Sequence, residues 1–248
     1  MTFLRNNLKL IIFLLVFGLV GGYFATAYSL ESLDPAMVDE AVAEAGSIEL
    51  IFVVAIIQAV IYSVGLGIVG KLLTERIGLW RPFTLEKKPL IEVGLISLVG
   101  GILFIVPDYF IFANYSEVIR DSYLSKPTFN YIVACVTYAP VVEEVMLRLF
   151  FMSLIAFALW KLSRREKVTE IQLVIGNVIS ALLFAAGHLP ATVMMIGITP
   201  MIIFRCFFMN GVFGLVFGYL FRKRGIHYAM LAHAGIHIVS IIIWFIFI

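Results

Sequence analysis

The sequence predicts an all-α polytopic membrane protein, a bundle of about seven transmembrane helices. Three observations lead to this prediction. Hydrophobic residues make up 62% of the 248 residues and charged residues only 14%, whereas a soluble domain has roughly 25% charged residues. The mean hydropathy is +1.05, and long stretches of the chain lack any charged side chain. A water-soluble fold is therefore excluded, because one core could not bury this much apolar surface.

A helix needs about 20 mostly apolar residues to cross the hydrocarbon layer of a membrane. The stretches that meet this requirement are residues 10–30, 50–70, 90–113, 128–160, 171–189, 201–221 and 226–248. The fourth is long for one crossing, and we expect Pro140 to break it, because proline removes a helical hydrogen bond. Residues 189–200 are apolar and contain two prolines, so this segment is predicted to be reentrant or interfacial.

The first apolar stretch has a second interpretation as a signal peptide. Arg5 and Lys9 precede the stretch, and Ala25-Thr26-Ala27 resembles a cleavage site. The apolar run is longer than the hydrophobic region of a typical signal peptide. Its length favours an uncleaved membrane anchor.

The distribution of Lys and Arg predicts the orientation in a cell membrane. Of the 18 such residues, only Arg120 and Lys126 fall on one side of the predicted spans, and Arg148 and Arg205 lie inside them. Because cytoplasmic loops carry the excess of basic residues, we expect a cytoplasmic N-terminus and an extracytoplasmic C-terminus.

Two carboxylates and a guanidinium interrupt the fourth apolar stretch. Residues four apart share a helix face, so Glu144 and Arg148 can form a pair. Glu143 points about 100° away from Glu144 and is left without this partner. The three residues could form an ion cluster that only fixes helix packing. That interpretation explains Glu143 poorly, because an additional buried anion costs free energy.

The four histidines lie in the last quarter of the chain. His188 falls at the end of the fifth predicted span, and His233 and His237 share one face of the last. A histidine in an apolar helix is more often a hydrogen-bonded core residue than a catalyst, and this alternative stays open for each of the three. His227 follows the basic residues 222–224, so we expect it at the membrane interface. With straight helices, His188 and Glu143 would lie near the extracytoplasmic side and His233 nearer the cytoplasmic side.

An unpaired carboxylate and several imidazoles in one pocket can activate water. A further histidine pair can donate hydrogen bonds to an oxyanion, and such a set suits amide hydrolysis. Alternatively, Glu143, His188 and His233 match the ligand types of a divalent metal such as zinc, although the HExxH spacing is absent. Cys135 and Cys206 lie in apolar runs and offer neither a disulfide framework nor a zinc site. The net charge of +2 does not indicate a nucleic-acid partner.

Three motifs in order resemble the CPBP family of intramembrane endopeptidases, which comprises CAAX prenyl proteases and bacteriocin-processing (Abi) proteins: Glu143-Glu144-x-x-x-Arg148, Phe184-x-x-x-His188 and His233-x-x-x-His237. All motifs fall in residues 128–248, which would form the catalytic helix bundle. Residues 1–127 would contribute transmembrane helices without motifs. The resemblance implies that Glu144 and Arg148 support the site.

The resemblance also implies catalytic roles and partners. Glu143 would be the base that activates water, His188 would assist it, and His233 and His237 would stabilise the oxyanion. The prenyl proteases typically have Asn at the position of His237, and a neutral histidine can also donate one hydrogen bond. The implied substrate is a peptide or protein in the lipid bilayer, prenylated and of CAAX type, or bacteriocin-like.

Two other functions remain alternatives. A proton-coupled transporter also uses buried Glu and His side chains, but it is typically built from paired repeats, and no repeat is visible in the sequence. A non-catalytic immunity or scaffold protein of the membrane would keep the same residues for packing.

Overall fold

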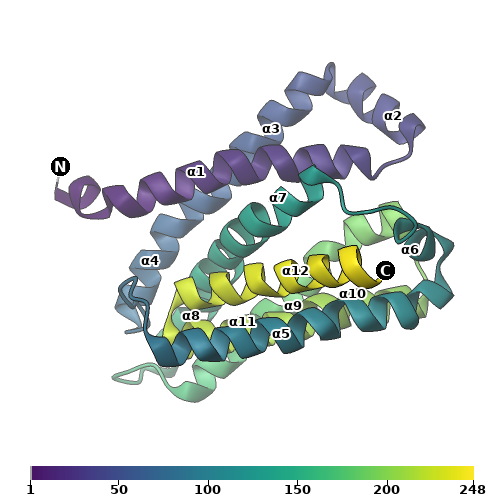
Figure 1. The fold of residues 1–248 in the computed structure, drawn as a ribbon. Helices are drawn as coiled ribbons and strands as arrows, with labels where there is room; N and C mark the ends of the chain where they lie inside the picture. Colours follow the sequence, from purple (N-terminus) through teal and green to yellow (C-terminus); the bar gives the residue numbers. More distant parts are fainter. Residues whose placement is uncertain (1) are drawn as a thin grey trace.

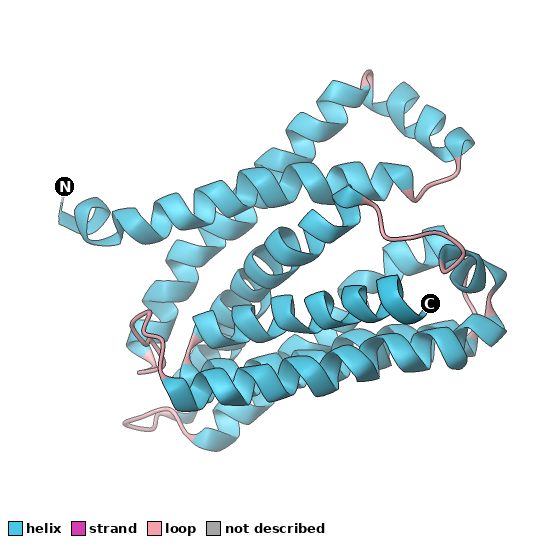
Figure 2. Cartoon of the chain, viewed as in Figure 1, coloured by secondary structure: helices cyan, strands magenta, loops and turns pink. Residues whose placement is uncertain are grey.

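The computed structural model describes residues 2–248, with side chains from residue 7 onward; the side chain of Arg5, counted above for orientation, lies outside this set. Over the described residues the chain is helical and contains no strand (Figure 2). Within residues 2–248, seven helical spans are long and apolar enough to cross a membrane, which confirms the predicted fold class. They are Asn7–Glu31, Ile48–Arg76, Lys87–Tyr115, Phe129–Ser163, Glu170–Ile196, Pro200–Arg224 and Ile226–Phe247.

The spans are assembled from α-helices, with π-helical segments inside three of them. The α-helices are α1 (Thr2–Glu31), α2 (Pro35–Ala45), α3 (Ile48–Val60), α4 (Leu66–Arg76), α5 (Lys87–Phe110), α6 (Glu117–Ser122), α7 (Phe129–Thr137), α8 (Ser153–Ser163), α9 (Glu170–Ile196), α10 (Pro200–Cys206), α11 (Phe213–Arg224) and α12 (Ile226–Phe247). The π-helical segments are Ile61–Gly65, Tyr138–Glu143, Val145–Met152 and Phe207–Val212.

Short polar residues define where several helices begin. The hydroxyl groups of Ser47, Thr128 and Thr199 accept hydrogen bonds from backbone N–H groups in the first turns of α3, α7 and α10. At the start of α9, Thr169 and Gln172 form a reciprocal capping box. These caps satisfy N–H groups that have no partner within the helix.

The span Phe129–Ser163 is not broken at Pro140, so the predicted break is wrong. Thr137 departs from regular helical geometry, with φ −122° and ψ −61°. The chain then continues through the π-helical segments Tyr138–Glu143 and Val145–Met152. A proline ring clashes with the carbonyl of residue i−4 in a regular α-helix, and the wider π-turn accommodates Pro140 within one continuous helix.

Residues 189–200 do not form a reentrant segment, and the alternative that they are interfacial stays a prediction. Helix α9 continues through Pro190 to Ile196 and ends at Gly197, which has a φ of +89°. Helix α10 then begins at Pro200, after the cap Thr199. Breaking a helix inside lipid would leave many backbone groups without partners. A proline within a continuous membrane helix frees only one carbonyl, which neighbouring groups can satisfy. His188 therefore lies eight residues before the end of its helix rather than at the end.

Small residues let the helices approach closely. Helices α5 and α12 run side by side (Figure 1), with Gly235 of α12 against Ser97 of α5 and Gly101 of α5 against Val239 of α12. Helix α11 packs on α9 in the same way, through Gly214 and Gly218. Such contacts replace the hydrophobic effect, which gives little attraction between helices in lipid.

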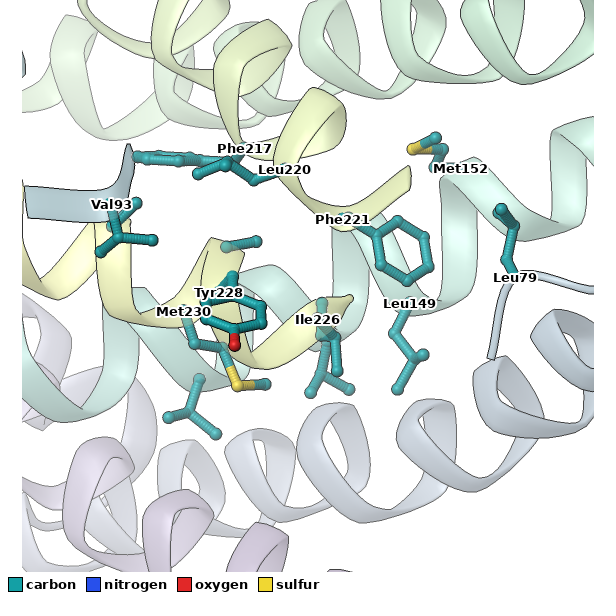
Figure 3. Close-up of a cluster of buried hydrophobic side chains, with 14 of the residues drawn as sticks. Leu79, Val93, Leu149, Met152, Phe217, Leu220, Phe221, Ile226, Tyr228 and Met230 are labelled. Carbon is teal, nitrogen blue, oxygen red and sulfur yellow. The ribbon is translucent and has the colours of Figure 1, made fainter. Parts of the chain in front are cut away.

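The largest group of buried apolar side chains joins the basic ends of several spans to one another (Figure 3). Most of it comes from the segment before α5, the π-helical segment Val145–Met152, α11 and α12, and α1, α5, α8, α9 and the segment Tyr138–Glu143 add one residue each. The residues labelled in Figure 3 are Leu79, Val93, Leu149, Met152, Phe217, Leu220, Phe221, Ile226, Tyr228 and Met230. The Tyr228 hydroxyl also accepts a hydrogen bond of 2.7 Å from the Glu86 backbone N–H. The two termini lie at opposite ends of the molecule (Figure 1).

Candidate functional site

The innermost part of the site is a cluster of three charged or titratable side chains. Oε1 of Glu144 lies 3.0 Å from NH1 of Arg148 and 2.9 Å from Nδ1 of His233. The side chains of Glu144, Arg148 and His233 are 0%, 1% and 4% exposed. The Glu144–Arg148 contact predicted from the spacing is therefore present. The contact to His233 joins α12 to the span Phe129–Ser163.

Two aromatic rings stabilise the charge of Arg148. Its guanidinium carbon lies 4.7 Å from the ring centroid of Phe184 and 5.4 Å from that of Phe217. Such cation–π contacts gain strength when they are desolvated. Gly214 leaves room for the guanidinium, because a Cβ atom at this position would lie 3.0 Å from NH2 of Arg148.

The second part of the site is more accessible. Oε1 of Glu143 lies 4.0 Å from Nε2 of His188, and the two side chains are 15% and 38% exposed. Nδ1 of His188 lies 2.9 Å from the carbonyl oxygen of Phe184 in its own helix. The nitrogen next to a carbonyl must carry the proton, so neutral His188 presents the lone pair of Nε2 towards Glu143. A gap of 4.0 Å is too long for a direct hydrogen bond and is suited to one bridging water.

His237 completes the set predicted from the sequence. Its ring stacks on that of His233, with 5.2 Å between centroids and 25° between planes. The ring of Phe104 from α5 meets His237 edge-on at 5.3 Å. Nδ1 of His237 is buried and makes no hydrogen bond in the described part of the chain. The ring of Phe184 contacts both His188 and His233, so one aromatic side chain links the accessible pair to the buried cluster.

The arrangement does not assemble a metal site. In the chain from residue 7 onward, no three His, Cys, Asp or Glu side chains are grouped so that they could hold a metal ion. This includes Glu143, His188 and His233, the set considered above for zinc. The carboxylate nearest to His233 is that of Glu144, which already contacts Arg148. These residues therefore do not fit a metal in this geometry.

Other polar residues of the spans lie outside the site. Arg205 forms a two-point contact with Asp108, with distances of 2.5 Å and 2.9 Å. The Tyr123 hydroxyl donates a 2.8 Å hydrogen bond to the same carboxylate. Burial, together with the negative charge of Asp108, raises the pKa of Tyr123. The cluster of Arg205, Asp108 and Tyr123 was not predicted from the sequence, although a lone Arg inside an apolar stretch indicates a buried partner.

Asn210 and His227 have structural contacts. Asn210 donates a 2.9 Å hydrogen bond to the carbonyl of Cys206 in the same span. Nε2 of His227 lies 2.8 Å from the carbonyl oxygen of Thr84, which agrees with its expected place near the helix end. Neither contact involves a residue of the candidate site.

Comparison with known families places this site in a recognised domain. Residues 125–239 match the family model of Rce1-like proteins, described as type II CAAX prenyl endopeptidase Rce1-like. No curated protein and no solved structure matches the chain. The matched range contains every motif residue of the site.

This match indicates what residues 125–239 are similar to. The family is a family of proteases, and seven apolar helices make the chain a multi-pass membrane protein. The similarity of residues 125–239 to Rce1-like proteins is consistent with the resemblance of the motifs to the CPBP family.

Proposed function

We propose that the protein is an intramembrane endopeptidase that hydrolyses a peptide bond with a water activated by Glu143 and His188. One observation carries this proposal. These two side chains are accessible and face each other across 4.0 Å, beside a dry Glu144–Arg148–His233 cluster. A carboxylate used only for packing would be expected in the buried cluster with its neighbour Glu144.

The Glu143 carboxylate and the Nε2 lone pair of His188 both accept hydrogen bonds, so a water between them can direct one O–H to each. Its own lone pair then points towards a substrate carbonyl. As the oxygen attacks, Glu143 takes the proton from water and later transfers it to the leaving amine. His188 orients the water and holds it in position while its oxygen attacks the carbonyl.

We propose that His237 and His233 stabilise the oxyanion of the tetrahedral intermediate. Neutral His237 can donate one hydrogen bond. His233 gives its Nδ1–H to Glu144, so its Nε2 can donate only when the ring is protonated. The carboxylate of Glu144, which also pairs with Arg148, orients the His233 ring, as the acidic residue does in catalytic triads. Glu144 and Arg148 therefore act through His233 rather than on the substrate.

The proposed substrates are membrane-associated peptides or proteins. The family match favours prenylated CAAX-type peptides, and bacteriocin-like peptides are the second class. Residues 128–248 would form the catalytic bundle and residues 1–127 the accompanying helices. A cytoplasmic N-terminus and an extracytoplasmic C-terminus are supported by the basic residues of the loops and by the position of the termini at opposite ends (Figure 1).

Peptide cleavage by the full chain in liposomes tests this proposal. The substrates would be prenylated CAAX peptides, the same peptides without the lipid, and bacteriocin-like leader peptides. We expect cleavage by the wild type and by Glu170→Gln, a control at an exposed carboxylate bound to Lys223, and none by Glu143→Gln. Undiminished cleavage by Glu143→Gln would contradict the mechanism. Cellular activity that survives in Glu143→Gln without cleavage would favour the scaffold alternative.

A further inference from the structure

A cavity of about 740 Å³ lies between the start of α1, the end of α4 and the segment that follows α4. It is separate from the candidate site, and neither the family match nor the proposed chemistry uses it. Its volume is within the range of roughly 300–1,000 Å³ that is typical of ligand sites. Figure 1 shows α1 and α4 diverging towards this end of the molecule.

The polar part of the cavity has a positive balance. Lys9 and Lys71 line it, and Glu75 is its single carboxylate. Lys71 forms an ion pair with Glu75 and lies 5.0 Å from the ring centroid of Trp80. Lys9 is exposed to the cavity and adds a second positive charge. The lining therefore has one net positive charge, which matches one phosphodiester group.

The rest of the lining is apolar and open. Leu10, Phe13, Leu72 and Phe83 form this wall, and the rings of Phe13 and Phe83 meet edge-on with 6.3 Å between their centroids. Leu72 and Phe83 are 43% and 49% exposed. A free phosphate ion would leave this wall uncovered, whereas an acyl chain would cover it.

We propose that this cavity binds one anionic phospholipid. The phosphate lies against Lys9 and Lys71, Trp80 packs beside the headgroup, and an acyl chain runs along the apolar wall. The cavity is at the Lys- and Arg-rich ends of the spans, where Trp is enriched at the membrane interface. Basic pockets between membrane helices on this side are suited to anionic headgroups.

The test uses the purified full chain in detergent with native mass spectrometry. Phosphatidylglycerol and phosphatidylcholine with identical oleoyl chains compete in equal amounts. We expect the wild type to prefer phosphatidylglycerol. Lys9→Gln and Lys71→Gln should each weaken its binding about fivefold relative to phosphatidylcholine. The matched control is Lys161→Gln, because Lys161 also lies over a Trp ring, 4.3 Å from the centroid of Trp160, but is not in the lining.

A second variant tests the apolar wall. Leu72→Trp fills part of the cavity at a half-exposed position and should reduce binding of both lipids. Equal binding of the two lipids by the wild type would overturn the proposal. This comparison uses the wild type alone, so it does not depend on the folding of a variant. Unchanged selectivity in the Lys9→Gln/Lys71→Gln double variant would overturn it as well. Complete displacement of phosphatidylglycerol by glycerol phosphate would show a site for soluble anions and contradict a lipid site.

Discussion

Nδ1 of His233 lies 2.9 Å from Oε1 of Glu144, across 89 residues of sequence. Through this contact the last helix holds the carboxylate that also contacts Arg148. Glu143, the next residue in the chain, takes no part in the contact and meets His188 instead. Two adjacent carboxylates therefore have different environments, and the proposed mechanism gives them different functions.

This difference predicts that replacing the two carboxylates has unequal effects on stability. Glu144→Gln leaves the buried guanidinium of Arg148 without its counter-charge, and the loss of one partner of a buried ion pair costs about 3–5 kcal/mol. Glu143→Gln removes a more accessible carboxylate whose nearest ionisable partner, His188, lies 4.0 Å away, beyond direct hydrogen-bond distance. We expect little change in its free energy of unfolding. Unfolding of both variants in the same detergent, followed by circular dichroism, measures the contrast. Equal destabilisation would contradict the separate environments.

The His237 side chain should be replaceable by Asn but not by Leu. Asn can donate a hydrogen bond to the oxyanion, as neutral histidine can, so His237→Asn should keep most of the activity. His237→Leu has a side chain of similar bulk without a donor, and loss of one oxyanion donor lowers kcat about 10²–10³-fold. Steady-state peptide cleavage measures both values. If His237→Leu cleaves as fast as the wild type, His237 does not contact the oxyanion.

Two glycines of one span should differ in their tolerance of a side chain. At Gly214 a Cβ atom would lie 3.0 Å from both Ala181 Cβ and Arg148 NH2, whereas at Gly211 the nearest neighbouring atom is Ala185 Cβ at 3.8 Å. Overpacking typically costs about 1–3 kcal/mol. We therefore expect Gly214→Ala to lower the unfolding temperature and Gly211→Ala to leave it near the wild-type value. The reverse order would show that α11 does not pack on α9 as described.

The sequence predicts the contacts that depend on local spacing. Apolar length identifies the seven spans, and the four-residue spacing identifies the Glu144–Arg148 pair. The Glu144–His233 and Asp108–Arg205 contacts join residues 89 and 97 positions apart. These contacts depend on how different helices pack against one another, and the sequence of a single helix does not predict that packing.

The two incorrect predictions about proline have a common physical cause. In water, a break in a helix exposes backbone groups that solvent can satisfy. In lipid the same break leaves them without partners, so the chain keeps its helix through Pro140 and Pro190. Because α9 continues past Pro190, His188 lies inside the bundle and reaches Glu143. With straight helices, Glu143 and His188 were expected at a different depth in the membrane from His233.

A double-mutant cycle on Glu143 and His188 tests the central claim most directly. Single-turnover cleavage would be compared for wild type, Glu143→Gln, His188→Asn and the double variant, in liposomes of one composition. Each single change should slow cleavage about 10²–10⁴-fold. If both groups act on one water, the double variant is scarcely slower than the slower single variant. Losses that multiply in the double variant, or wild-type rates in either single variant, would contradict a shared water.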